Sequence, residues 1–136
     1  MTTDLIAWLR AQLDEDERIA VDAALLADSE RWTASARNGW DEIRDGRRRR
    51  VAEARNDERT HIARHDPARV LAEVEAKRRI IDRAAAFQDS TGVTLNVDSF
   101  TAIAAQMRSI LRVLATAYAD CPGYREEWRP MSEEMT

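Results

Sequence analysis

Apolar side chains recur every three or four residues over the first 27 positions, which is the spacing of one face of an α-helix. This face comprises Leu5, Trp8, Leu9, Leu13, Ile19, Ala20, Ala23 and then Leu26 or Ala27. Thr3 is a suitable N-cap because a hydroxyl can accept a backbone N–H that the first helical turn leaves unpaired. The pattern therefore predicts an amphipathic N-terminal helix with Trp8 in its buried stripe.

The pattern changes at about residue 31, where turn dipeptides appear. Asn38-Gly39 and Asp45-Gly46 are typical of tight β-hairpin turns. The segments around them have the length of short strands and predict a three-stranded antiparallel meander of Trp32–Ala36, Trp40–Arg44 and Arg48–Ala54. A helical alternative stays open for this region, because Ala, Arg and Glu are good helix formers.

Helical spacing returns after the meander. A short helix is predicted over Asn56–His65, and Asp66-Pro67 predicts the start of a longer one to about Gln88, because Asp favours the N-cap and Pro the first helical position. Another helix with a strongly apolar face is predicted from Asp98 or Ser99 to about Tyr118. The main core is expected on the two long helices, from Val70, Leu71, Val74, Ile81, Phe100, Ile103, Met107, Ile110, Leu111 and Leu114.

Together these elements predict an α+β fold with an N-terminal helix, a small three-stranded antiparallel meander, two long helices and an aromatic tail; an all-α helical bundle is the alternative. The 136 residues are enough for one domain. We expect a single globular domain over residues 1–130 and a flexible tail over residues 131–136. The apolar stretches are far shorter than the roughly 18 residues that a membrane span needs, so no membrane contact is expected. A lone cysteine, Cys121, and the lack of a leader-like start predict a cytoplasmic location.

The net charge of −4 is unevenly distributed along the chain. Residues 1–30 hold eight acidic and two basic residues, a net charge of −6, whereas residues 31–55 hold four acidic and eight basic residues, a net charge of +4. Lys77 is the only lysine among 21 basic residues. GC-rich codon usage explains such a bias, and so does a need for guanidinium groups that pair with carboxylate or phosphate through two hydrogen bonds. Opposite charges of this kind are satisfied either within the molecule or by a partner.

The densest basic sequence is the turn from Arg44 to Arg50. Its arginines are candidates for phosphate contacts, and a neighbouring tryptophan is a candidate platform for base stacking. The candidate nucleic-acid residues are Arg44, Arg47, Arg48, Arg49, Arg50 and Trp40. Two alternatives stay open: a solvated hairpin edge whose charges prevent edge-to-edge pairing, or ion pairs between these arginines and the acidic run Asp14–Glu17.

A second candidate contact lies in the tail. Tyr, Trp and Arg are enriched among the residues that dominate binding energy at protein interfaces. The candidates are Tyr124, Arg125, Trp128 and Arg129. The alternative is that the tail aromatics fold back on the first or last helix and close the core.

His61 and His65 lie four residues apart and so share a helix face, which is a spacing that suits two metal ligands. A zinc site needs a third ligand, for which Cys121 and Asp66 are the available residues, and no Glu follows His61 as a metalloprotease helix requires. These two histidines are weak candidates, and we predict no metal and no cofactor. The four glycines are isolated from one another, and neither a phosphate-binding loop nor a Gly-x-Ser-x-Gly elbow is present. The sequence therefore predicts no catalytic residue, and an enzyme is not expected.

Three stretches of the chain form a recognisable set: the opening Leu5–Ala20, the segment His61–Ile80 with its His-Ile-Ala-Arg-His-Asp-Pro-Ala-Arg-Val-Leu start, and Tyr118–Pro130 with its Tyr-Arg-Glu-Glu-Trp-Arg-Pro end. Together they resemble a family of small actinobacterial and actinophage proteins that is labelled a domain of unknown function. Relatives often carry a Thr-Pro-Gly-Pro-Trp turn where this chain has Ala27–Trp32, so its first helix is expected to run longer. The resemblance implies no activity.

The leading hypothesis is a small intracellular accessory protein that acts by protein–protein interaction, with a different protein or as a homo-oligomer. The resemblance adds the expectation of an association with phages or mobile elements. The second hypothesis is a nucleic-acid-associated protein that uses the Arg44–Arg50 turn.

Overall fold

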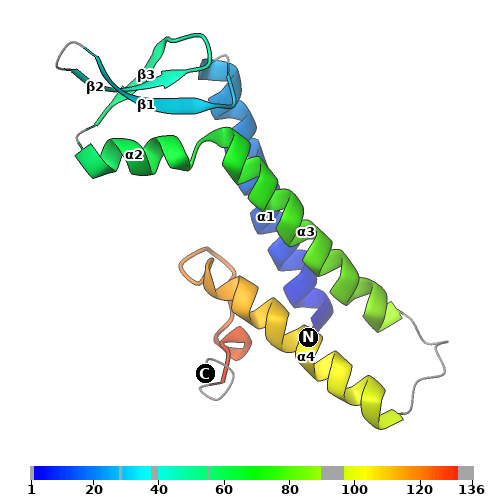
Figure 1. Cartoon of the computed structure of the whole chain (residues 1–136). Coiled ribbons are helices and arrows are strands. Elements are labelled where there is room, and N and C mark those ends of the chain that lie inside the picture. The colour runs from blue at the N-terminus through cyan, green and yellow to red at the C-terminus, as the bar shows by residue number, and fades with distance from the viewer. Residues whose placement is uncertain (1, 28, 38–39, 55, 90–96, 132–136) are drawn as a thin grey trace. The chain divides into compact units, whose positions relative to one another are not determined.

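The computed structural model describes residues 2–27, 29–37, 40–54, 56–89 and 97–131, without the side chains of residues 35–37, 40, 41, 56, 89 and 97. The elements are α1 (Thr2–Ala27), β1 (Trp32–Arg37), β2 (Trp40–Asp45), β3 (Arg50–Glu53), α2 (Asn56–Arg64), α3 (Pro67–Asp89), α4 (Val97–Thr116) and the 3-10 turn η1 (Glu126–Trp128) (Figure 1). The predicted α+β fold is confirmed, and the all-α alternative is wrong.

Two compact units divide the chain, and each is described by itself. Unit 1 comprises Met1–Leu13 and Ala76–Thr136, and unit 2 comprises Asp14–Glu75. Both α1 and α3 therefore contribute residues to each unit. The single domain expected over residues 1–130 stays a prediction.

In unit 2 the three strands form an antiparallel sheet in the order β1-β2-β3. Ala34 pairs with Ile43 and Glu42 pairs with Glu53. Ile43, at the centre of β2, is fully buried, and α2 lies along one face of the sheet (Figure 1). The strand bounds differ from the predicted ones by one or two residues at their ends, and the predicted Asn38-Gly39 turn lies outside the described residues.

The predicted Asp45-Gly46 turn has the right place but the wrong geometry. β2 ends at Asp45 and β3 begins at Arg50, so four residues connect them. The residue in the left-handed region is Arg48, with φ 64°, and not Gly46. Gly46 is required for another reason: its N–H donates to Ser29 Oγ over 3.0 Å, and a Cβ at position 46 would lie 2.8 Å from that oxygen.

The predicted helix start at Asp66-Pro67 is confirmed. Asp66 Oδ1 accepts the backbone N–H of Arg69 over 2.9 Å, which caps α3, while Oδ2 accepts the backbone N–H of Trp32 over 3.0 Å. Ala68 donates its N–H to the carbonyl of Glu30 over 2.9 Å. The start of α3 thus holds the entry to β1 in place.

The first helix, α1, begins at Thr2. Thr3 therefore lies inside the helix, and its predicted N-cap role is wrong.

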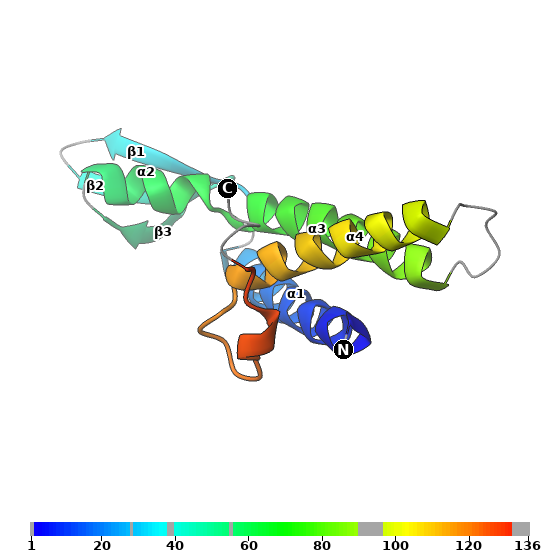
Figure 2. The ribbon, with the colours of Figure 1, turned by 90° about the horizontal axis from the view of Figure 1, so that it is seen from below.

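Unit 1 is built from the start of α1, the second half of α3, α4 and the tail. Figure 2 shows α4 beside the end of α3, where Phe87 and Phe100 stack with ring centroids 4.9 Å apart. Arg10 of α1 donates to Asp82 of α3 over 3.0 Å. Among the described residues, the hydrophobic core of the unit consists of Leu5, Ile6, Leu9, Leu13, Ile81, Ala84, Leu111, Ala115 and Trp128, and Pro130 is buried as well.

The core expected on the two long helices is confirmed only in part. Val74, Ile81 and Leu111 are buried, but Ile110 is 41% exposed, so its predicted burial is wrong. The other members of the predicted set are half-buried. Among the helices of the described ranges, none has the length and apolarity that crossing a membrane requires.

Candidate functional site

The end of α1 exposes large apolar side chains in unit 2. Leu26 is 89% exposed, Leu25 73% and Ile19 53%. Periodicity predicts burial for Ile19 and then for Leu26 or Ala27. The prediction for Ile19 is wrong, and of the other two Leu26 is exposed whereas Ala27 is half-buried. Ala20, in contrast, is buried as predicted. Leu25 and Leu26 are consecutive, so on a helix they point in directions about 100° apart, and a single buried stripe does not cover both.

Leu26 lines an open groove of about 420 Å³, which we call the Leu26 groove. Its lining residues come from α1, β1, the end of β2, the loop that follows and the start of β3: Ala23, Leu26, Ala27, Trp32, Asp45, Arg49, Arg50 and Val51. The Arg49 and Arg50 side chains are each more than half exposed. The groove therefore combines an apolar wall from α1 with two guanidinium groups.

Leu25 lines a smaller hollow of about 290 Å³ together with Val21, Ala24, Ser29 and Glu30, which we call the Leu25 hollow. Ser29 is the same residue that accepts the N–H of Gly46, and its hydroxyl also donates to the carbonyl of Arg31 over 3.0 Å. The segment after α1 is thereby tied to the loop that carries the arginines. Two apolar depressions thus lie on α1 near its end.

Asp45 fixes the arginine loop beside the Leu26 groove. Its side chain is buried, and its Oδ1 accepts the backbone N–H groups of Arg47 and Arg49, each over 2.9 Å. Arg49 Nε also lies 3.4 Å from Asp45 Oδ2. Burial raises the pKa of the Asp45 carboxyl, but the N–H groups of Arg49 and Arg47 and the Arg49 guanidinium lower it more, so the pKa lies below its usual value.

The predicted basic residues gather at this loop, and three of them form ion pairs inside the meander. Arg47, Arg48, Arg49 and Arg50 are exposed, and Arg44 is half-buried. Arg44 pairs with Glu42, Arg49 with Asp45, and Arg50 with Glu53 over 2.5 Å. The side chain of Trp40 lies outside the described residues.

Part of the acidic run of α1 pairs within the helix. Arg18 donates two hydrogen bonds to Glu15, over 2.6 and 2.8 Å, and one to Asp22 over 3.0 Å. The hydrogen bonds from Arg18 lower the pKa of Glu15 despite a smaller opposing effect of burial. The negative charge of Glu15 is thus balanced by Arg18 of the same helix.

The tail candidates lie in unit 1: Trp128 is buried, Tyr124 is half-buried, and the two arginines are exposed. Trp128 is 4% exposed and packs on Trp8 with ring centroids 5.2 Å apart. The ring centroids of Tyr124 and Trp8 are 5.8 Å apart. The aromatics therefore fold back on α1, as in the second of the two interpretations from sequence. Arg125 and Arg129 are exposed and bind Asp4 and Glu126, over 3.3 and 3.2 Å.

The two histidines lie next to each other at the end of α2. Their ring centroids are 4.4 Å apart, both residues are exposed, and His65 Nδ1 lies 2.8 Å from the carbonyl oxygen of His61. Asp66, one of the two suggested third ligands, uses its carboxylate oxygens for Arg69 and Trp32. Within the described part of the chain, no group of three or more metal-ligating side chains occurs.

Sequence reasoning missed the exposed leucines, although a signal for them is present. An adjacent Leu25-Leu26 pair at the end of a helix cannot be placed on one narrow apolar stripe. It also missed Arg108 and Arg112, which lie four residues apart in α4, a helix whose only acidic residue is Asp98. The two leucines line the depressions of unit 2, and the two arginines line a pocket of unit 1.

The fold and these surfaces define a small α+β protein that carries two apolar depressions, of which the Leu26 groove is also lined by arginines. The chain belongs to the family of unknown function DUF6221, whose sequence model matches residues 2–130. This confirms the expected membership of a family of unknown function. Searches of curated proteins and of solved structures found no match to the chain.

Proposed function

We propose that the protein acts by contact with another protein, through the Leu26 groove and the Leu25 hollow. The observation that carries the proposal is the 89% exposure of Leu26 next to Leu25, which is 73% exposed. Exposed apolar side chains that lie together mark interaction sites, because covering them removes apolar surface from water. In this proposal the protein is an accessory factor and not an enzyme.

The charges beside the groove support a partner of particular chemistry. Arg49 and Arg50 line the groove, where they pair with Asp45 and Glu53, and Arg47 and Arg48 are exposed on the same loop. A partner segment with apolar side chains flanked by carboxylates would be complementary to this surface, and opposite charges also speed association. A second copy of this chain meets the same description through the acidic residues of its α1, so a homo-oligomer is within the proposal.

The family resemblance extends the proposal to cellular context. The stretches Leu5–Ala20, His61–Ile80 and Tyr118–Pro130 support a cytoplasmic protein associated with phages or mobile elements. Gene neighbourhoods rich in phage genes would support this extension, and neighbourhoods of unrelated housekeeping genes would contradict it.

The second candidate function is nucleic-acid association. Four consecutive exposed arginines, Arg47 to Arg50, favour it, since each phosphate contact adds salt-dependent affinity. The ion pairs of Arg49 with Asp45 and of Arg50 with Glu53 weigh against it. A titration with single-stranded DNA at low salt decides: binding that is lost in the Arg47→Gln/Arg48→Gln variant supports this function, and no binding excludes it.

The protein-contact proposal is tested with two matched charge insertions. Leu26→Glu changes the Leu26 groove, whereas Val113→Glu changes a 49% exposed residue of α4 in unit 1. We expect Leu26→Glu to abolish partner capture from the native host, or to convert an oligomer to a monomer in light scattering, while Val113→Glu leaves both unchanged. Equal behaviour of the two variants would contradict the proposal.

A further inference from the structure

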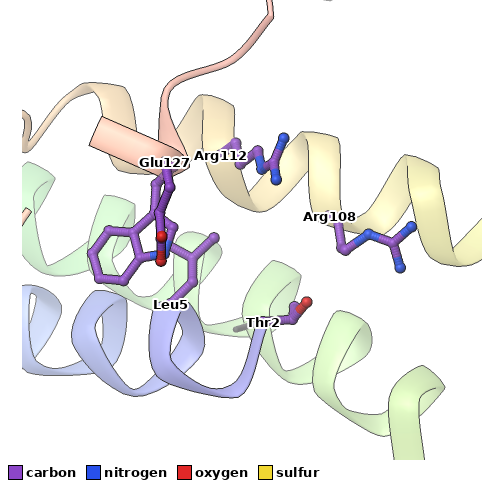
Figure 3. A pocket seen from close by; sticks show the side chains of 6 residues that line it. Thr2, Leu5, Arg108, Arg112 and Glu127 are labelled. Carbon is purple, nitrogen blue, oxygen red and sulfur yellow. The ribbon is translucent and has the colours of Figure 1, made fainter. Parts of the chain in front are cut away.

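A pocket of about 470 Å³ lies in unit 1, on residues that the proposed function does not use. It is lined by Thr2 and Leu5 from α1, Arg108 and Arg112 from α4, and Glu127 and Trp128 from η1 (Figure 3). Small-molecule sites have volumes of about 300–1,000 Å³. The pocket is therefore large enough for a small organic ligand.

Two residues supply an apolar lining. Leu5 and Trp128 are both nearly fully buried as residues, yet both contribute surface to the pocket. An apolar ligand group placed against them gains the free energy of removing its own surface from water. This part of the pocket selects for a hydrocarbon chain or ring.

Two guanidinium groups lie one helical turn apart at the same pocket. Arg108 and Arg112 are four residues apart on α4, so they share a helix face, and Figure 3 shows both side chains leaving the same side of the helix. Within the described ranges, neither guanidinium has an ion-pair or hydrogen-bond partner. Arg10 in the same unit, in contrast, is paired with Asp82. Among the described residues, the guanidinium groups of Arg108 and Arg112 are thus not paired with a carboxylate.

A buried hydrogen-bond donor adds an independent observation. Trp128 Nε1 is buried, and no acceptor for it occurs among the described residues. The neighbouring indole of Trp8 does have an acceptor, because its Nε1 donates to the carbonyl of Pro122 over 3.0 Å. A buried N–H without an acceptor is destabilising. The indole that carries this N–H also lines the pocket, so its N–H signal can report on a ligand bound there.

From these observations we infer that the pocket binds a small organic acid with an apolar body and a single carboxylate. Arg108 and Arg112 pair with the carboxylate, and the apolar body lies against Leu5 and Trp128. Glu127 also lines the pocket, and its carboxylate is 3.5 Å from Arg125. With two arginines and one glutamate, the lining has a net charge of +1, which favours a monoanion over a phosphate dianion.

Decanoate is a suitable probe, and 1-decanol is its uncharged counterpart. We expect calorimetric titration of the full chain to give a Kd below 1 mM for decanoate and at least tenfold weaker binding of 1-decanol. Decanoate should also shift one of the four indole N–H signals in a ¹H–¹⁵N spectrum, the signal that disappears in Trp128→Phe. No decanoate binding, equal binding of the two probes, or a shift of another indole alone would overturn the inference.

Variants of exposed residues separate the site from general folding effects. Arg108→Gln/Arg112→Gln should weaken decanoate binding at least tenfold, because a charge-assisted pair is lost. Arg83→Gln, on an exposed residue of α3 that does not line the pocket, should leave binding unchanged. Equal losses in both variants, or no loss in the double variant, would overturn the inference.

A protein chain end offers the same chemistry as a small acid. An N-acetylated trileucine with a free C-terminal carboxylate therefore serves as the competing probe. Tighter binding of decanoate than of this peptide supports a small acid as the ligand, and tighter binding of the peptide overturns that assignment.

Discussion

Gly46 and Ser29 approach so closely that no side chain fits between them: the N–H of Gly46 is 3.0 Å from Ser29 Oγ, and a Cβ would lie 2.8 Å from it. Ser29 Oγ also exchanges hydrogen bonds with Arg31, over 3.0 and 3.2 Å. Moving the hydroxyl away would therefore disturb several hydrogen bonds. This contact ties the arginine loop to the segment that follows α1.

Gly46→Ala is consequently expected to lower the free energy of unfolding by about 0.5–1.5 kcal/mol, the net value of a hydrogen bond. Ser29→Ala removes the obstructing oxygen, so the same Gly46→Ala change should cost less in that background. Urea denaturation of the four proteins of this double-mutant cycle measures the difference. An identical cost in both backgrounds would show that the close approach does not restrict position 46.

The packing of Trp128 on Trp8 predicts that the tail stabilises unit 1. Trp128→Ala should lower the free energy of unfolding by about 3–5 kcal/mol, as is typical for a buried aromatic residue. Truncation after Asp120 should cost at least as much, because it removes Tyr124 along with Trp128. Urea denaturation of both variants tests this. A truncated protein as stable as the intact chain would instead support a tail that only contacts partners.

The lowered pKa of Asp45 predicts that the folded protein loses stability in acid. Because this pKa is lowered in the folded protein, the Asp45 carboxylate contributes stability above the pKa of the unfolded state, about 3.9, and this contribution is lost as the pH falls through the lower folded value. Asp45→Asn should therefore be less stable than the native chain at pH 7, and the difference should shrink as the pH falls below about 4.

Urea denaturation at several pH values measures that difference. Asp57→Asn, at an exposed position in the first turn of α2, is the matched control and should show a smaller difference at pH 7. A difference for Asp45→Asn that stays constant from pH 7 to pH 2 would contradict the assigned role of its charge.

The sequence predicted features that depend on local chemistry. Asp66-Pro67 starts α3 because an acceptor at the N-cap and a fixed φ at the next residue act within one turn. The meander was predicted from its turn dipeptides, although the second turn has four residues and places Arg48 in the left-handed region. Gly46 was recognised as a turn residue, but its contact with Ser29, 17 residues away, has no local signal.

Features that depend on tertiary packing were not predictable. Periodicity groups Leu26 with the buried face of α1, but whether another element covers that face is decided by residues distant in sequence. For Trp128 the sequence offered burial against a helix as one of two interpretations, and it could not decide between them because the burial depends on Trp8 at the other end of the chain. The pocket at Arg108 and Arg112 requires Thr2 and Leu5 as well, and no spacing in the sequence links these segments.

The measurement that tests the proposed protein contact most directly is site-specific photocrosslinking in the native host. A benzophenone amino acid is placed at position 26 in one protein and at position 113 in another. The account predicts one dominant crosslinked product from position 26, either a heterologous partner or, at twice the chain's mass, a second copy, and none from position 113. The same products from both positions, or no product from position 26, would contradict it.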